Sequence, residues 1–344
     1  MALRDEIFEQ PAVLRNWLNT QLDQAKHIAQ AIAARKVDFV FLAARGTSDH
    51  AGVYGQYVWG SLNHLPVAFA APSLFTRYGG WPRLQNALVI GVSQSGQSPD
   101  VVSVIAEGRK QGALTLAITN DVNSPLAAAA EYTLDVNAGA EKAVAATKSF
   151  TAELLAVAAL AAAMDPDAPH LNALWQIPDA VEQALQLEAE VEQRAQELCE
   201  MNHCVVLGRG YNYAVAMEWS LKLKELAYVF AEPYSTADFQ HGPIAIVEPG
   251  FHVLAVAPSG VVLPDLVAVI QRLKEQGAHV LVLSDNPQAL ALGNEALRLP
   301  EGLPEWLSPI VSIVPAQLFA YHLTRAKGFD TEKPRGLRKV TLTR

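Results

Sequence analysis

The chain has 344 residues, of which 51% are hydrophobic and 18% are charged, and its formal net charge is −9. This composition is typical of packed globular domains rather than of disordered chains. The acidic balance argues against a nucleic-acid partner, because binding to a phosphate backbone needs clustered lysine and arginine. The length is sufficient for two domains, each with a core of its own.

The N-terminus and the apolar runs argue against export and against membrane insertion. Residues 1–6 lack the apolar core of a signal peptide, and the alanine-rich run at 154–164 is too short to cross a bilayer. The two cysteines, Cys199 and Cys204, fit neither a disulfide framework nor a zinc knuckle. We therefore expect a cytoplasmic protein with no metal, no cofactor and no membrane partner.

Residues 5–35 are predicted to form one or two helices, because apolar side chains recur there near helical spacing. Strands and helices then alternate. The predicted strands lie at 37–44, 65–70, 87–92, 114–119 and 132–136, and the predicted helices at 49–62, 99–111 and 147–164. Gly112 follows the second helix as a C-terminal cap. This alternation predicts a parallel sheet with helices on both faces.

Residues 165–178 are rich in proline and aspartate and are predicted to be a linker, followed by a charged amphipathic helix at 180–200. The second half repeats the pattern. Its predicted strands lie at 204–207, 253–257 and 280–283, and its predicted helices at about 213–230 and 265–276. The expected domains are a helical segment at 1–34, an α/β domain at 35–165, a linker and helix at 166–195, a second α/β domain at 196–328 and a basic tail at 329–344.

An internal duplication relates the two halves. The segment from Pro99 to Ile105 matches that from Pro264 to Ile270, with an offset of 165 residues. Gln-Gly-Ala recurs at 111–113 and 276–278 with the same offset, and Arg-Gly recurs at 45–46 and 209–210. A register held over most of each half indicates two copies of one fold.

The loop after the strand at 87–92 is the richest in polar groups. It reads Ser-Gln-Ser-Gly-Gln-Ser at 93–98, and Pro99 then opens a helix with Ser98 as its N-cap. Backbone N–H groups at a helix N-terminus, together with serine hydroxyls, suit a dianionic phosphate, although an ordinary capped turn has the same sequence. The second copy, at 258–263, has lost most hydroxyls, so we expect one ligand site per chain, in the first half.

Four further groups are candidates for chemistry, each with a plainer alternative. Gly-Thr-Ser at 46–48 follows the first strand. It either shares a ligand-binding crevice with the loop at 93–98 or forms a simple helix cap. Lys222 and Glu225 share a helix face, where Glu225 moves a proton or forms a surface salt bridge. His241, before a Gly-Pro break, lies on a loop and is catalytic or structural. Lys339, in the basic tail, either loses its proton beside other cations and attacks a carbonyl, or is solvated.

Taken together, these pieces resemble the sugar isomerase (SIS) family and, within it, the isomerase half of the glucosamine-6-phosphate synthases. The resemblance runs from about residue 35 to the end. Its motifs are Ala-Arg-Gly-Thr-Ser at 44–48, Ser-Gln-Ser-Gly-Gln-Ser at 93–98, Ala-Ala-Thr-Lys at 145–148, Leu-Gly-Arg-Gly at 207–210, Leu-Lys-Leu-Lys-Glu at 221–225, His-Gly-Pro at 241–243 and Pro-Arg-Gly-Leu-Arg-Lys at 334–339. It implies two tandem flavodoxin-like domains and a homodimer in which His241 is shared across the interface.

The resemblance also implies a role for each matching residue. Glu225 moves a proton between C1 and C2 of a sugar phosphate, with Lys222 beside it. His241 opens the sugar ring, and Lys339 forms a Schiff base at C2. The residues implied to bind or line the substrate are Gly46, Thr47, Ser48, Ser93, Gln94, Ser95, Ser98, Glu141, Val144, Ala146 and Arg338.

This chain departs from the family pattern at several positions. Ala146 replaces a serine, Arg338 replaces a small residue and Arg45 replaces a cysteine, which bears on the substrate more than on the mechanism. The sequence begins with a helical segment where the synthases carry an amide-cleaving domain, so we expect no release of ammonia from glutamine.

We therefore predict isomerising deamination of glucosamine 6-phosphate to fructose 6-phosphate and ammonia. Three other enzymatic readings stay open: deglycation of a fructosamine 6-phosphate, deamination of a galactosamine phosphate, and simple aldose–ketose isomerisation. A non-catalytic sugar-phosphate sensor is the alternative from a different class.

Overall fold

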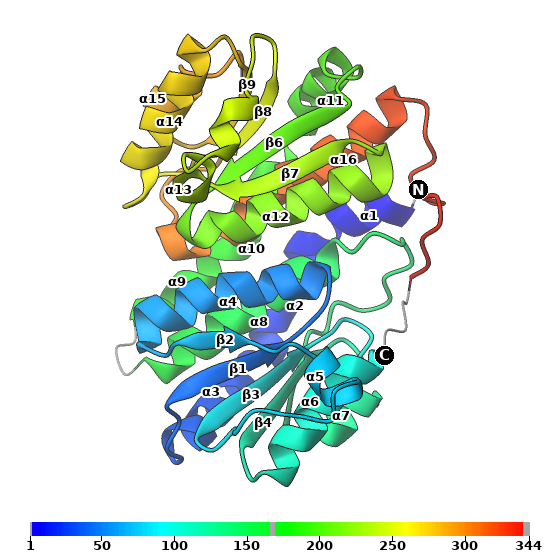
Figure 1. The fold of residues 1–344 in the computed structure, drawn as a ribbon, viewed down its shortest axis with the longest axis vertical. Coiled ribbons are helices and arrows are strands. Elements are labelled where there is room, and N and C mark those ends of the chain that lie inside the picture. Colours follow the sequence, from blue (N-terminus) through cyan, green and yellow to red (C-terminus); the bar gives the residue numbers. More distant parts are fainter. Residues whose placement is uncertain (1, 166–168, 340–344) are drawn as a thin grey trace. The chain divides into compact units, whose positions relative to one another are not determined.

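A computed structural model describes residues 2–165 and 169–339 (Figure 1). These residues form two compact units. The first unit comprises 12–141, 148–165, 169–175 and 338–339, and the second comprises 2–11, 142–147 and 176–337. The chain therefore passes between the units several times, and the domain boundaries given above stay a prediction. Each unit contains one five-stranded sheet.

Residues 2–33 form three helices, so the prediction of one or two is wrong. They are α1 (Ala2–Phe8), α2 (Gln10–Thr20) and α3 (Leu22–Ala33). Pro11 has no backbone N–H to donate to a preceding turn, so it is tolerated only in the first turn of a helix. Its place as the second residue of α2 fits a break between α1 and α2.

The first sheet has the order β2-β1-β3-β4-β5, and all its pairings are parallel. Its strands are β1 (Phe39–Ala43), β2 (Val67–Phe69), β3 (Ala87–Val92), β4 (Leu114–Thr119) and β5 (Tyr132–Asp135). All five were predicted, with ends that differ by up to two residues. Every residue of β3 and β4 is buried, as continuous apolar runs require in a sheet covered on both faces.

Helices cover both faces of the first sheet (Figure 1). On one face, α8 (Lys148–Met164) packs against α3 and against α4 (Thr47–Asn63). On the other, α6 (Pro99–Lys110) packs against α5 (Ser73–Thr76) and α7 (Pro125–Ala129). The core beneath α6 joins Val104 and Ile105 to Val89 of the sheet. The strand order and the two layers of helices are those of a flavodoxin-like fold.

The second sheet has the order β10-β9-β8-β6-β7, which is the same topology as the first when read from β7. Its strands are β6 (His203–Gly208), β7 (Phe230–Ser235), β8 (His252–Val256), β9 (His279–Ser284) and β10 (Glu295–Arg298), all parallel. This identity of strand order confirms the internal duplication. The edge strands β7 and β10 were not predicted.

The helix predicted at 213–230 is wrong in its last part. α12 (Tyr213–Lys222) passes into a π-helical turn, η3 (Leu223–Ala227), and Tyr228 then takes a left-handed conformation with φ of 55°. That conformation stops the helix, and β7 begins two residues later. β7 contains Pro233, which is tolerated because this strand lies at the edge of the sheet.

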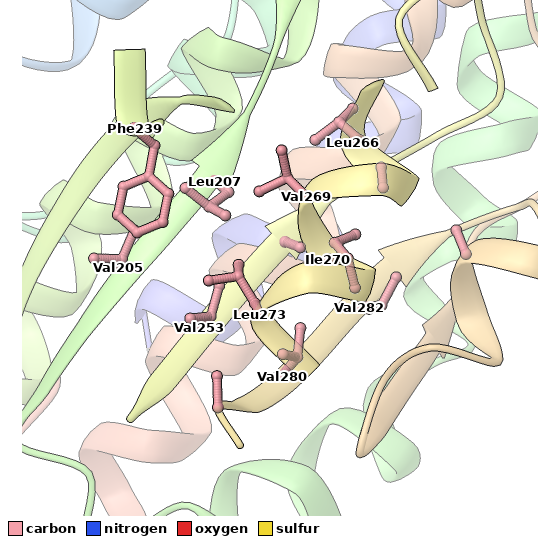
Figure 2. Close-up of a cluster of buried hydrophobic side chains, with 14 of the residues drawn as sticks. Val205, Leu207, Phe239, Val253, Leu266, Val269, Ile270, Leu273, Val280 and Val282 are labelled. Carbon is pink, nitrogen blue, oxygen red and sulfur yellow. The ribbon is translucent and has the colours of Figure 1, made fainter. Parts of the chain in front are cut away.

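A layer of helices packs on each face of the second sheet as well. On one face, α16 (Ser308–Ala326) packs against α12, α10 (Ile177–Leu185) and α11 (Glu188–Glu197). The other face carries α13 (Thr236–Phe239), α14 (Leu263–Glu275) and α15 (Pro287–Leu290). Figure 2 shows the core under α14, where Leu266, Val269, Ile270 and Leu273 of the helix pack with strand residues such as Val253.

The predicted linker at 165–178 is helical from residue 169 onward. α9 (Pro169–Ala173) and η1 (Leu174–Gln176) lead directly into α10, while 166–168 lie outside the described residues. Two of the prolines that suggested a linker, both among the described residues, stand at helix starts: Pro169 begins α9 and Pro178 lies in the first turn of α10. A missing N–H costs nothing at those positions. The helix predicted at 180–200 is likewise two helices, α10 and α11.

α16 is a core helix that was not predicted from the sequence. The stretch Glu305–Ala326 is long and apolar enough to cross a membrane, but its most apolar 18-residue window is 100% buried inside the structure. It is also longer than the alanine-rich run at 154–164. Pro309 and Pro315 within α16 interrupt the pattern that normally reveals a helix.

The end of β6 offers a test of packing. A Cβ atom on Gly208 would lie 2.4 Å from the backbone oxygen of Asn212, which cannot move away without shifting the turn. We expect Gly208→Ala to lower the free energy of unfolding by about 1–3 kcal/mol, measured by urea denaturation. The control is Gly60→Ala in α4, where nothing lies within 4 Å, and which should raise stability by about 0.5–1 kcal/mol. Equal stability of Gly208→Ala and wild type would contradict this packing.

Candidate functional site

Two polar loops meet at the carboxyl edge of the first sheet. β1 and β3 are paired neighbours, so the loop at 44–48 lies beside the loop at 93–98. Gly96 has φ of 61°, and a Cβ atom there would lie 2.1 Å from Oγ of Ser124, so only glycine fits. Its N–H donates to Oγ of Ser93 at 3.2 Å, and the next N–H, of Gln97, donates to Oγ of Ser95 at 3.3 Å.

Ser98 stands at the N-cap of α6 with Pro99 as the first helical residue, as predicted. Its side chain makes no capping hydrogen bond. A serine at an N-cap normally accepts a bond from an N–H of the first turn. The hydroxyl of Ser98 is therefore not used by its own helix, at an edge where helix N–H groups favour anions.

Ser48 has a buried partner that the sequence analysis missed. Its hydroxyl donates to Oε1 of Glu153 on α8 at 2.9 Å, and both residues are buried. No local spacing could reveal this pair, because the two residues are 105 positions apart. Of the Gly-Thr-Ser segment, Gly46 caps α4 with a positive φ and Thr47 begins the helix.

The same arginine–aspartate pair occurs at the edge of both sheets. Nε of Arg45 lies 2.8 Å from Oδ2 of Asp100 in the first sheet, and Nη2 of Arg209 lies 3.2 Å from Oδ2 of Asp265 in the second. Each pair ties the loop after the first strand of its sheet to the helix after the third. The Arg45 side chain is 52% exposed, whereas Asp100 is buried. Arg45 therefore brings a cation to the edge that carries the 93–98 loop.

In the equivalent loop of the second sheet, backbone N–H groups donate hydrogen bonds to carboxylate side chains of the same chain. The N–H of Ser259 donates to Oδ1 of Asp285 at 2.6 Å, and the N–H of Val261 donates to Oε2 of Glu305 at 2.8 Å. At the position that matches Asp285, the first half has the neutral Asn120. An external anion at the second loop would meet two negative charges. This supports the expectation of one phosphate site per chain, in the first half.

The second unit contains a buried ion cluster around Lys222. Its Nζ lies 2.5 Å from Oε2 of Glu225 and 3.4 Å from Oε1 of Glu218. Burial by itself would lower the pKa of Lys222, but the two carboxylates outweigh it and raise the pKa, so the side chain is an ammonium. Lys222 and Glu218 are fully buried, and Glu225 is 24% exposed. The pair is therefore not a surface salt bridge, the plainer reading of its spacing.

Glu225 sits on the π-helical turn η3, whereas Lys222 ends the preceding α-helix. Single π-helical turns inside helices are frequent at functional sites. Glu218 was not predicted, although its spacing of four from Lys222 places both on one helix face. A charged residue in the otherwise apolar run of α12 was the signal available in the sequence.

Glu141 and Lys339 are joined in the first unit. Nζ of Lys339 lies 2.7 Å from Oε2 of Glu141, whose carboxylate also accepts the N–H and the hydroxyl of Ser149 at 3.1 and 2.8 Å. The Glu141 side chain is completely buried and that of Lys339 is 26% exposed. The structure thus brings together two of the predicted site residues that lie 198 positions apart.

The remaining predicted residues lie on loops. Val144 and Ala146 are half-buried in the segment 142–147, whose first two N–H groups bond to the buried carboxylate of Glu6. His241 is exposed in the turn between α13 and η4 (Pro243–Ile246), and Arg338 is exposed beside Lys339. Within residues 2–165 and 169–339, no group of histidine, cysteine and carboxylate side chains is arranged to hold a metal ion.

Comparison with known proteins identifies the family. The SIS domain model matches this chain twice, at residues 35–163 and 197–326. The chain therefore belongs to the SIS domain family and carries two copies of the domain, each spanning one of the five-stranded sheets.

Several relatives share about a third of their aligned residues with this chain. The isomerizing glutamine–fructose-6-phosphate aminotransferase of Pyrococcus horikoshii is 33% identical over 340 residues, and that of Legionella pneumophila (strain Paris) is 36% identical over 346. These alignments cover 97% of this chain but 56% and 57% of the relatives, so the chain spans little more than half of their length.

Solved structures agree with this assignment. The C-terminal domain of glucosamine–fructose-6-phosphate aminotransferase from Francisella tularensis has a TM-score of 0.87 at 28% identity, covering 97% of this chain and 98% of that one. Glucosamine-6-phosphate deaminase from Thermotoga maritima shares the fold, with a TM-score of 0.78 at 23% identity over the whole of both chains.

The ion cluster around Lys222 predicts a defined response to mutation and pH. Lys222→Met leaves the carboxylate of Glu218 buried without its cation, so we expect a loss of about 3–5 kcal/mol at pH 8. Glu218→Gln combined with Lys222→Met should recover most of that loss, because the double variant no longer buries this carboxylate. Urea denaturation at several pH values measures both effects.

The wild-type protein should respond at alkaline pH. Because the folded pKa of Lys222 is raised, its stabilising contribution is complete below the unfolded value of about 10.4 and is lost as pH rises through the higher folded value. Lys222→Met should lack this alkaline decline. An identical pH dependence in both proteins would count against a charged Lys222.

Proposed function

We propose that this chain is a phosphosugar isomerase that acts on an amino-sugar phosphate, and that it converts glucosamine 6-phosphate to fructose 6-phosphate and ammonia. The observation that carries the proposal is the Glu218–Lys222–Glu225 cluster. In it, the buried charges of Glu218 and Lys222 hold the partly exposed carboxylate of Glu225. Membership of the SIS family, and relatives named for an isomerizing reaction on fructose 6-phosphate, support it.

Glu225 is the proposed base that takes the C2 proton and returns it to C1. A base of this kind must reach the substrate while its position is fixed by groups that do not react. Glu225 is the member of the cluster that is partly exposed, and the buried Lys222 holds its Oε2. A positioned general base supplies roughly 10²–10⁴-fold in rate.

The loops at 44–48 and 93–98 are the proposed phosphate cradle. They offer helix N-termini, the hydroxyl of Ser98 and the guanidinium of Arg45 at one sheet edge. A phosphate held there binds the substrate far from the reacting carbons, and that binding energy orients C1 and C2. In the second half, the matching loop is bonded to Asp285 and Glu305 instead.

The remaining steps use His241 and Lys339. We propose that His241, donated by the partner subunit of a homodimer, opens the sugar ring. Proton transfer by Glu225 converts the C2 amine to an imine, Lys339 displaces ammonia by forming a Schiff base, and water then releases the ketose. We propose that the protein acts in the cytoplasm as an enzyme of amino-sugar metabolism.

Substitution of Glu225 tests the proposal. Glu225→Gln keeps the size of the side chain but removes the base, so release of ammonia from glucosamine 6-phosphate should fall by about 10²-fold or more, while binding measured by calorimetry persists. Unchanged turnover would remove Glu225 from the mechanism. If wild type binds the sugar phosphate but turns over none of a panel of amino-sugar and ketose phosphates, the chain is a sensor rather than an enzyme.

The repeated arginine–aspartate pair gives a matched control for the cradle. Arg45→Ala should weaken binding of glucosamine 6-phosphate about 10- to 100-fold, because a hydrogen bond to a charged group contributes about 1.5–3 kcal/mol. Arg209→Ala breaks the equivalent pair at the sheet edge without the cradle, and should leave the affinity unchanged. Equal losses in the two variants would mean that the pair only supports the fold.

A further inference from the structure

The contact between Glu141 and Lys339 indicates a role for Glu141 beyond lining a pocket. A carboxylate with no exposed surface is costly unless it is paired and hydrogen-bonded. Glu141 meets that need with Ser149 on one side and with the ammonium of Lys339 on the other. Ser149 is the second residue of α8, a 17-residue helix whose N-terminal partial charge favours the carboxylate.

This arrangement fixes each oxygen of the carboxylate. Oε1 accepts the N–H of Ser149, whereas Oε2 accepts both the Ser149 hydroxyl and Lys339. The carboxylate is therefore held by the body of the first unit, and the tail is held by the carboxylate. Lys339 is the partly exposed member of the pair, so its amine is the group that can turn toward a substrate.

A lysine in this state cannot attack carbon. A nucleophilic amine needs its lone pair, and an ordinary lysine, with a pKa of about 10.4, is an ammonium at neutral pH. The proton must leave before the Schiff base forms. Oε2 of Glu141, at 2.7 Å, already accepts a hydrogen bond from this ammonium.

We propose that Glu141 docks the tail through Lys339 and carries the protons of the Schiff-base step. This inference rests on the proposed function. Glu141 takes one proton from the ammonium of Lys339. The freed lone pair of Nζ forms a bond to C2 of the substrate imine, and the electron pair of the C2=N bond moves to the substrate nitrogen.

The same carboxylate transfers the protons of the remaining part of the step. Glu141 returns its proton to the substrate nitrogen, and then relays a second proton to that nitrogen from Nζ. Ammonia leaves with the electron pair of its bond to C2, and the lone pair of Nζ closes the C2=Nζ bond. Glu141 ends as a carboxylate, and the single positive charge passes from the Lys339 ammonium to the iminium.

Borohydride trapping of the full chain with glucosamine 6-phosphate tests this role. Mass spectrometry locates and quantifies the reduced adduct on Lys339 between pH 6.5 and 9.5. Glu141→Gln keeps the shape but accepts no proton, so trapping at pH 7 should fall about 10²-fold or more. It should recover as pH rises, because hydroxide then accepts the proton in place of the missing carboxylate, whereas trapping in the wild type should vary little.

Ser149→Ala is the matched control, because it removes one hydrogen bond to Glu141 and keeps the carboxylate. It should lower trapping less than tenfold and keep the wild-type pH profile. Glu141→Gln with wild-type trapping at every pH, or with a uniform loss that pH does not relieve, would overturn the proton-carrying role. Absence of any adduct in wild type would overturn the Schiff-base step of the proposed function itself, which is a separate outcome.

Discussion

Burial of parallel sheets on both faces is the constraint on which the rest of this structure depends. Every residue of β3 and β4 is buried, so these strands have no place for polar chemistry along their length. Polar groups are left to the loops at the carboxyl edge, where helix N-termini also gather. Because both sheets have the same strand order, the chain has two such edges. Both edges keep an arginine–aspartate pair, but their loops have diverged: the first offers hydroxyls, whereas the second is bonded to the carboxylates of Asp285 and Glu305.

The strand pattern was predictable because burial on both faces leaves a direct trace in the sequence. Continuous apolar runs located β3 and β4, and the repeated segment after Pro99 and Pro264 located the matching helices. The failures have equally physical causes. β7 is an edge strand with Glu232 and Pro233, so it lacks an apolar run, and β10 is four residues long. Prolines at 169, 178, 309 and 315 stand inside or at the start of helices, although in sequence they suggest breaks.

The site was predictable only where its residues are close in sequence or match a family motif. The spacing of Lys222 and Glu225 placed them on one face, but it did not indicate burial, and Glu218 went unnoticed. Ser48 and Glu153 are 105 residues apart, and Glu141 and Lys339 are 198 apart. Contacts of this kind are set by packing of the whole unit, so no local pattern contains them. The resemblance supplied candidate residues, whereas the partners that hold them came from the structure.

The two lysines of the proposed mechanism differ in how many carboxylates hold them and in how much water reaches them. Lys222 is buried between two carboxylates, which raise its pKa, so it remains a fixed positive charge beside the base. Among residues 2–165 and 169–339, Lys339 pairs with the carboxylate of Glu141, and 26% of its side chain is exposed, so its proton has both an acceptor and a route to solvent. A lysine held by one carboxylate can lose its proton by a single transfer, which leaves both groups neutral in a site that is costly for charge. In the proposed mechanism, a lysine paired with carboxylate therefore provides a permanent charge in one unit and a proton relay in the other.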